Sequence, residues 1–278
     1  MKPKPTLRYF LSIAGSTLLA TSAAQAQLYW DQNAATAGAG ATPTGTWGTS
    51  NFWNTDSTGA NLGAFQVGTL NTDDLFFVAA PGAASGNNAY VVTTSLAQVA
   101  NSLTFQASGA TTLSGGTSIT LGNGTPGAGG ITMNQFAFGS TAQGAATIST
   151  AVILNNTQTW TNNAAAGLAV KGGINNAGNT LTIAGTGNFD LGDNTANIIT
   201  GAGGFTMNGT GKLTLSASGT TPAHNFSGAL TINAGTVGFQ SAGSLGTGNI
   251  EGHSEKSLAK LPDPAAPGLP PSGRPDAS

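Results

Sequence analysis

Residues 205–215 read FTMNGTGKLTL, and this short stretch contains the pattern that decides the fold. Two triplets with Thr between apolar residues, Phe205-Thr206-Met207 and Leu213-Thr214-Leu215, stand on either side of an Asn-Gly sequence. Alternate side chains of an extended chain point to opposite faces, so each triplet places two apolar side chains on one face and Thr on the other. Asn and Gly favour turns. The stretch therefore predicts two short strands, each with one buried face, joined by a turn.

The same triplet recurs through the middle of the chain. Further copies are Leu103-Thr104-Phe105, Ile119-Thr120-Leu121, Ile131-Thr132-Met133, Leu181-Thr182-Ile183 and Leu230-Thr231-Ile232. Where the spacing widens, we expect degenerate strands in residues 147–154 and 168–170. Such short strands cannot bury their apolar face alone, so they must stack on neighbouring copies. We predict a right-handed parallel β-helix, a solenoid of short Gly/Thr/Asn-rich rungs, over residues 75–250.

Composition supports an all-β chain and argues against nucleic acid as a partner. The 278 residues include 42 Gly, and only 6% of the residues are charged. Both Glu residues, Glu251 and Glu255, lie near the carboxyl end, so no amphipathic charged helix can be drawn across the middle. The formal net charge of −2 lacks the basic surface that binding to DNA or RNA requires.

The amino terminus has the pattern of a secretory signal peptide, which we assign to residues 1–26. Positive residues come first, an apolar stretch follows over residues 9–20, and Ala24-Gln25-Ala26 matches a cleavage site. The apolar stretch is too short and too polar for a membrane-spanning helix, and we expect no transmembrane segment in the mature chain. The chain has no Cys, so an exported domain would depend on stacking rather than disulfides for stability.

Aromatic residues concentrate in residues 27–74, which we interpret as an amino-terminal cap. Three of the four Trp residues, Trp30, Trp47 and Trp53, lie in this segment. Large aromatic side chains can cover the apolar interior that the first rung of a repeat array leaves open. The alternative interpretation is a platform on which these three rings contact a glycan.

The polar residues suggest no catalytic centre, no metal site and no cofactor. Asp190 and Asp193 could contribute oxygen ligands to Ca²⁺, but a turn between rungs explains them more simply. Lys171 and Asp190 could meet on neighbouring rungs, although nothing in their spacing requires it. The glycine pattern of residues 122–127 matches the spacing of a dinucleotide-binding loop, but the next element reads as a strand rather than the required helix.

One region resembles a known family more specifically. It consists of Gly209-Thr210-Gly211-Lys212-Leu213-Thr214-Leu215, Asn225-Phe226-Ser227-Gly228, Leu230-Thr231-Ile232-Asn233-Ala234-Gly235-Thr236-Val237 and Gly246-Thr247-Gly248. Residues 209–250 resemble one repeat of the bacterial autotransporter-associated β-strand repeat proteins, with a departure at His224-Asn225-Phe226, where the family usually has an Asn-Thr-Tyr-like segment. The resemblance implies a passenger region that is secreted or displayed on the surface of a Gram-negative-type bacterium.

On this basis we expect a structural or adhesin-like β-helical protein without catalysis, whose partner is a surface, matrix or glycan ligand. A β-helical carbohydrate-binding or polysaccharide-degrading protein is the first alternative. Residues 251–278 differ from the repeats because they contain seven charged residues and half of the Pro residues, and we predict a disordered tail there. This tail is too short for the membrane barrel that the family resemblance implies. A truncated, nonfunctional passenger fragment is therefore the second alternative.

Overall fold

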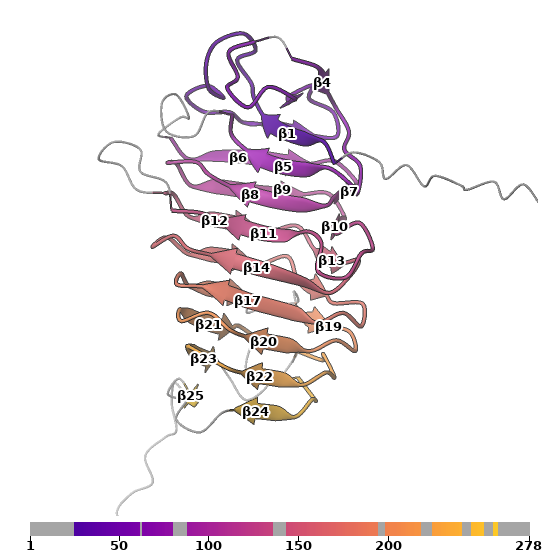
Figure 1. Ribbon diagram of the computed structural model, residues 1–278, viewed down its shortest axis with the longest axis vertical. Coiled ribbons are helices and arrows are strands. Elements are labelled where there is room, and N and C mark those ends of the chain that lie inside the picture. The colour runs from indigo at the N-terminus through magenta and orange to yellow at the C-terminus, as the bar shows by residue number, and fades with distance from the viewer. Residues whose placement is uncertain are drawn as a thin grey trace, which may run out of the picture.

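The strands wind into coils that stack along one long axis (Figure 1). The computed structural model describes residues 25–61, 63–79, 88–135, 143–193, 198–217, 224–240, 246–252 and 258–260. Within these ranges the chain forms strands and turns and contains no helix. The predictions of an all-β fold and of a parallel β-solenoid are confirmed. The predicted signal peptide lies outside the described residues, apart from its last two positions.

Three sheets run along the stack, and each contains strands from successive coils. In the described residues, sheet I contains β1 (Gln27–Trp30), β3 (Trp53–Asn54), β4 (Phe65–Gln66), β5 (Asp74–Phe77), β8 (Ser102–Phe105), β11 (Gly130–Met133), β14 (Gln158–Asn162), β17 (Leu181–Gly185), β20 (Phe205–Met207), β22 (Leu230–Ile232) and β24 (Ile250–Gly252). Sheet II contains β2 (Gly45–Trp47), β6 (Tyr90–Thr94), β9 (Thr111–Gly115), β12 (Ala146–Ile148), β15 (Leu168–Val170), β18 (Phe189–Leu191), β21 (Lys212–Leu215), β23 (Thr236–Phe239) and β25 (Leu258–Lys260). Sheet III contains β7 (Ala97–Ala100), β10 (Ser118–Leu121), β13 (Val152–Leu154), β16 (Ile174–Asn175) and β19 (Ile199–Thr200).

Each full coil contributes one strand to each sheet, in the order I, II, III. In the described residues, five successive coils from β5 to β19 follow this order. Neighbouring strands of these coils pair in parallel, for example Thr147 with Ala169 and Ala169 with Asp190 on sheet II. A parallel pairing keeps the same face of each strand directed inward from coil to coil. The period-2 pattern of a single triplet is thereby converted into a continuous apolar interior.

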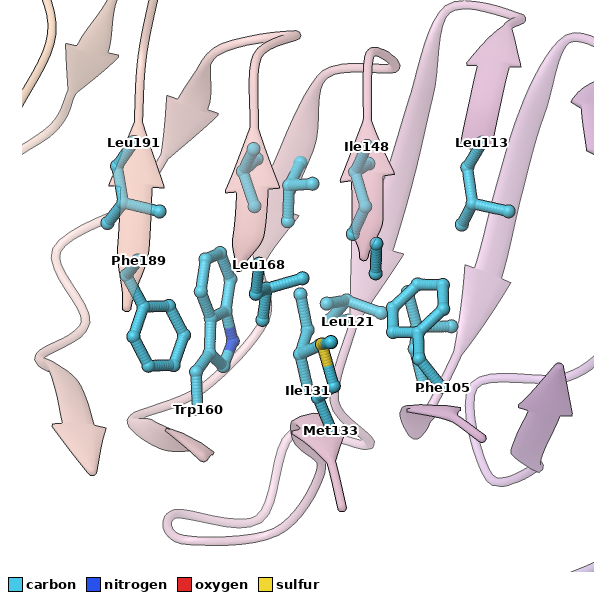
Figure 2. Close-up of a cluster of buried hydrophobic side chains, with 14 of the residues drawn as sticks. Phe105, Leu113, Leu121, Ile131, Met133, Ile148, Trp160, Leu168, Phe189 and Leu191 are labelled. Atoms are coloured by element: carbon cyan, nitrogen blue, oxygen red, sulfur yellow. The ribbon is translucent and has the colours of Figure 1, made fainter. Parts of the chain in front are cut away.

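The interior consists of columns of apolar side chains in register between coils. On sheet II one such column contains Leu113, Ile148, Val170, Leu191, Leu215 and Phe239. The first five of these side chains are completely buried and Phe239 is 6% exposed. Figure 2 shows side chains of the central coils pointing into the space between the sheets, including Met133 and Trp160. Burying a large apolar side chain stabilises the fold by about 2 kcal/mol, so this interior is the main source of stability.

Buried Asn side chains hold the corners at which sheet III passes into sheet I. Asn176 is completely buried, and its Nδ2 donates to the backbone oxygen of Gly203 at 2.7 Å while its Oδ1 accepts from the backbone nitrogen of Gly203 at 2.9 Å. In the next coil, Gly201 has φ +107° and leaves the space that the Asn176 amide occupies. Asn156 lies against Gly122 of the preceding coil in the same manner. These contacts satisfy backbone groups that no strand pairing reaches at the corner.

The amino-terminal end is closed by an aromatic cluster on antiparallel strands. β3 pairs antiparallel with both β1 and β4, unlike the strands that follow. Trp53 packs edge to face against Trp30 and Trp47, with ring centroids 4.9 and 5.6 Å apart. Phe77 of the first full coil packs against Trp53 and stacks on Phe105 of the second coil. The cluster therefore joins the end of the chain to the interior of the solenoid.

The carboxyl-terminal sheets continue into the segment predicted to be a tail. β24 pairs in parallel with β22, and β25 pairs in parallel with β23. Both pairings extend the stack beyond residue 250. The remainder of that segment, residues 253–257 and 261–278, lies outside the described residues.

Candidate functional site

The three tryptophans predicted as candidate glycan contacts lie inside the cap. Trp30, Trp47 and Trp53 are each 0% exposed. The indole nitrogen of Trp30 donates to the backbone oxygen of Pro43 at 2.7 Å, and that of Trp47 donates to Thr69 Oγ1 at 3.1 Å. No ring face of the three is open to solvent, which favours their interpretation as cap residues over that of a glycan platform.

The glycine pattern at residues 122–127 lies in a turn. This segment connects β10 to β11, so a strand follows it, as the sequence predicted. A dinucleotide-binding loop requires a helix whose amino terminus faces the pyrophosphate. In the described structure the φ values of Gly122, Gly124 and Gly127 are instead positive, at 99°, 88° and 83°. Glycine adopts such values readily in tight turns, so the turn itself accounts for these three residues.

The structure brings Lys171 and Asp190 together on neighbouring coils. Lys171 directly follows β15, Asp190 is the middle residue of β18, and Lys171 Nζ lies 2.6 Å from Asp190 Oδ2. The two side chains are 28% and 43% exposed, respectively. Within the part of the chain that the structure describes, this is the one ion pair between side chains.

A third coil contributes a hydroxyl group to the same carboxylate. Ser216, which follows β21, donates its Oγ–H to Asp190 Oδ1 at 2.6 Å. Gly192, two residues after Asp190, has φ +81°, and a Cβ at this position would lie 2.5 Å from the backbone oxygen of Ser216. Three consecutive coils thus meet in one polar contact, in which each carboxylate oxygen receives one donor.

This arrangement does not resemble a calcium site. Both oxygens of Asp190 already accept donors, and a cation would have to compete with Lys171. In the described ranges, no group of three or more His, Asp or Glu side chains converges to hold a metal ion. Asp190 is therefore a residue of a polar contact between coils.

A hollow of about 400 Å³ lies beside this contact on the outer face of sheet II. One outward column in register over β12, β15, β18 and β21 contains Thr147, Ala169, Asp190 and Thr214. Lys212 forms part of the wall. Sequence reasoning identified Lys171 and Asp190 but missed this hollow, because it depends on the register of four separated strands.

His224 lies apart from the hollow and is almost fully buried. Its Nδ1 accepts a hydrogen bond from the backbone nitrogen of Ile199 at 3.0 Å, and its Nε2 has no hydrogen-bond partner. Burial disfavours the charged imidazolium and lowers the pKa of His224 to about 4. His224 is thus neutral and faces inward, and its hydrogen bond to Ile199 places it beside β19 at the edge of sheet III.

Comparison with protein-family models, curated proteins and solved structures found no match. Among the described residues there is no helix of sufficient length and apolar character to span a membrane.

Proposed function

We propose that this chain is an exported structural passenger of the autotransporter-associated β-strand repeat type, displayed at a bacterial surface as a stalk with adhesin-like contacts and without catalysis. The observation that carries the proposal is the continuous stacking of coils. Because each coil contacts only its neighbours, such a chain forms an elongated body whose side faces are available for contact. The signal-peptide pattern and the repeat resemblance support export and display.

The outward side chains are suited to a surface that must stay soluble without charge. On sheet I, the column Thr159, Thr182, Thr206 and Thr231 crosses four coils in register. Asn233 Nδ2 donates to Asn208 Oδ1 at 2.9 Å on the corner beside this column. Hydroxyl and amide groups keep such a face hydrated. They also allow hydrogen bonds to a matrix of similar chemistry.

The proposal is tested by following the full chain in a Gram-negative host. We expect removal of residues 1–26, which mass spectrometry would detect as a mature chain beginning at Gln27, and labelling of the folded chain on intact cells. The control replaces Leu18 and Leu19 by Arg to interrupt the apolar part of the signal sequence. Uncleaved chain that stays inside the inner membrane in both strains would refute export.

A second candidate function is carbohydrate binding, and the hollow on sheet II favours it. Its polar groups come from several coils and offer donors and acceptors beside small side chains. Such a surface can hold a hydroxylated chain with or without catalysis. A polysaccharide-degrading activity would need a second acid or base near Asp190, so incubation of the chain with polysaccharides followed by a reducing-end assay tests it directly.

A further inference from the structure

The hollow on sheet II owes its shape to a change in side-chain size along the stack. Thr147, Ala169, Asp190 and Thr214 form one outward column in register over β12, β15, β18 and β21. Ala169 is the smallest residue of this column, and the longer polar side chains of Asp190 and Lys212 bound the hollow toward β18 and β21. At a strand spacing of about 4.8 Å, four strands span roughly 14 Å, which is the scale of a short oligomer rather than a single small molecule.

The charges around the hollow do not cancel. Residues 27–250 contain two Lys and no Arg, and both lysines, Lys171 and Lys212, lie on this side of the solenoid. Lys171 is neutralised by Asp190. Lys212 has no ion-pair partner among the described residues, and its stem extends over Gly238 of the next coil, with Cε 3.0 Å from the point a Cβ would occupy there. The Lys212 ammonium group therefore lies at the edge of the hollow that faces β23, as a positive charge without an ion-pair partner among the described residues.

Neutral hydrogen-bonding groups surround this charge. Asn188 Oδ1 accepts the backbone N–H of Lys212 at 3.0 Å, which fixes the Asn188 amide, while its Nδ2 donates to no described residue. Thr147 and Thr214 add hydroxyl groups that can donate and accept. The outward residues of β12 and β15 offer no deep apolar pocket of the kind that anchors an aromatic or aliphatic side chain of a protein partner.

The geometry points to this hollow as the binding site for an acidic saccharide chain, such as a polyuronate. The Lys212 ammonium, at the edge of the hollow that faces β23, pairs with a sugar carboxylate at that end of the bound chain. The Asn188 amide and the hydroxyls of Thr147 and Thr214 exchange hydrogen bonds with the sugar hydroxyls. Lys171 neutralises the Asp190 carboxylate, which would otherwise repel an acidic ligand. This inference deepens the proposed surface function by naming the face and the chemistry of the ligand.

The test uses the folded full chain and calorimetric titration at low salt with a hexameric oligogalacturonate and with a neutral gluco-oligosaccharide of the same length. The acidic oligomer should bind and the neutral one should bind more weakly. Lys212→Gln should weaken binding of the acidic oligomer about two- to five-fold, the range expected for one solvent-exposed charge pair. Raising the salt concentration should remove most of this difference.

Asp190→Asn separates the acidic from the neutral assignment by the sign of its effect. For an acidic oligomer it removes a negative charge and releases Lys171, so affinity should rise about two- to five-fold. For a neutral oligomer it removes an acceptor for sugar hydroxyls, so affinity should fall. A fall in affinity together with an indifferent Lys212→Gln variant would overturn the acidic assignment.

A matched pair of Thr variants tests the location. Thr214→Val removes a hydroxyl from the hollow, whereas Thr206→Val removes one from the equivalent middle position of a triplet on sheet I. Only Thr214→Val should weaken binding, by about two- to ten-fold for one lost hydrogen bond. Equal effects of the two Thr variants would overturn the inference. So would the absence of binding of the acidic oligomer to a chain that circular dichroism shows to be folded.

Tighter binding of poly-glutamate than of the oligosaccharide would assign the site to an acidic peptide instead. A chain that reaches the cell surface yet binds no acidic saccharide would leave the proposed surface function standing.

Discussion

His224 should make the stability of this chain depend on pH in a range where few other described groups titrate. Its pKa is lowered to about 4 by burial, whereas a His in an unfolded chain titrates near 6.5. Between these two values the unfolded state binds a proton that the folded state does not. The stability that the neutral His224 ring contributes should therefore be fully present above about pH 6.5. The free energy of unfolding should fall by this contribution as the pH decreases toward 4.

The size of the effect follows from the difference between the two pKa values. A difference of about 2.5 units at 1.36 kcal/mol per unit corresponds to about 3 kcal/mol, of which about 2 to 3 kcal/mol should be lost between pH 7.5 and pH 4.5. Urea unfolding followed by circular dichroism at a series of pH values measures this loss. Carboxylate groups also titrate near the lower end, so the wild-type curve alone does not isolate His224.

The control variant is His224→Asn, which removes the titrating ring and keeps an acceptor near the position of Nδ1. That acceptor can still receive the backbone N–H of Ile199, which otherwise would be left without its partner. The variant should be less stable at neutral pH because it fills less space, but it should lack the His-dependent part of the slope. Identical pH dependence in both proteins would refute the reasoning, because it would show that His224 has the same pKa in the folded and unfolded states.

Three further predictions concern the corners, the cap and the ion pair, all measured as changes in the free energy of unfolding by urea titration. Gly201→Ala should cost about 3 kcal/mol or more, because its φ is +107° and a Cβ would lie 2.2 Å from Asn176 Oδ1, whereas Gly178→Ala, with φ +84° and nothing within 4 Å, should cost only about 1 kcal/mol; equal costs would contradict the role of the corner amide. Trp53→Ala should cost about 3 to 5 kcal/mol, because it opens a cavity in a fully buried cluster, and a cost below 1 kcal/mol would show that the cap does not stabilise the coils. Lys171→Met should cost less than about 1 kcal/mol, because its ion pair is partly exposed, and a larger loss would indicate a stronger structural role for the pair.

Five of the seven triplets became strands of sheet I, and one each became a strand of sheets II and III. Leu103-Thr104-Phe105, Ile131-Thr132-Met133 and Leu181-Thr182-Ile183 all became strands of sheet I, because two inward side chains are enough to define a period of 2. β16 and β19 of sheet III are two residues long, and each has one buried apolar residue. A single apolar residue has no period, so such strands become recognisable only when neighbouring coils pair with them.

The polar features were harder to predict because they depend on distances between coils. The candidate meeting of Lys171 and Asp190 was recognisable from their residue types, but their contact required the register of β15 and β18. The role of Asn176 could not be read from sequence, since Asn is common in turns throughout the chain and its burial follows from Gly201 in the next coil. Likewise, the aromatic residues of the cap indicated a cluster, while their complete burial depended on packing against Phe77.

The aromatic closure of one end gives the molecule a direction of assembly. The cap precedes the coils along the chain, and the antiparallel pairings of β3 join segments that all belong to the cap. Each subsequent coil then meets a finished edge whose unpaired backbone groups guide its strands into register, so its ordering can be completed locally as the chain grows. Loss of the cap should consequently slow the folding of every later coil, including those that never touch an aromatic residue.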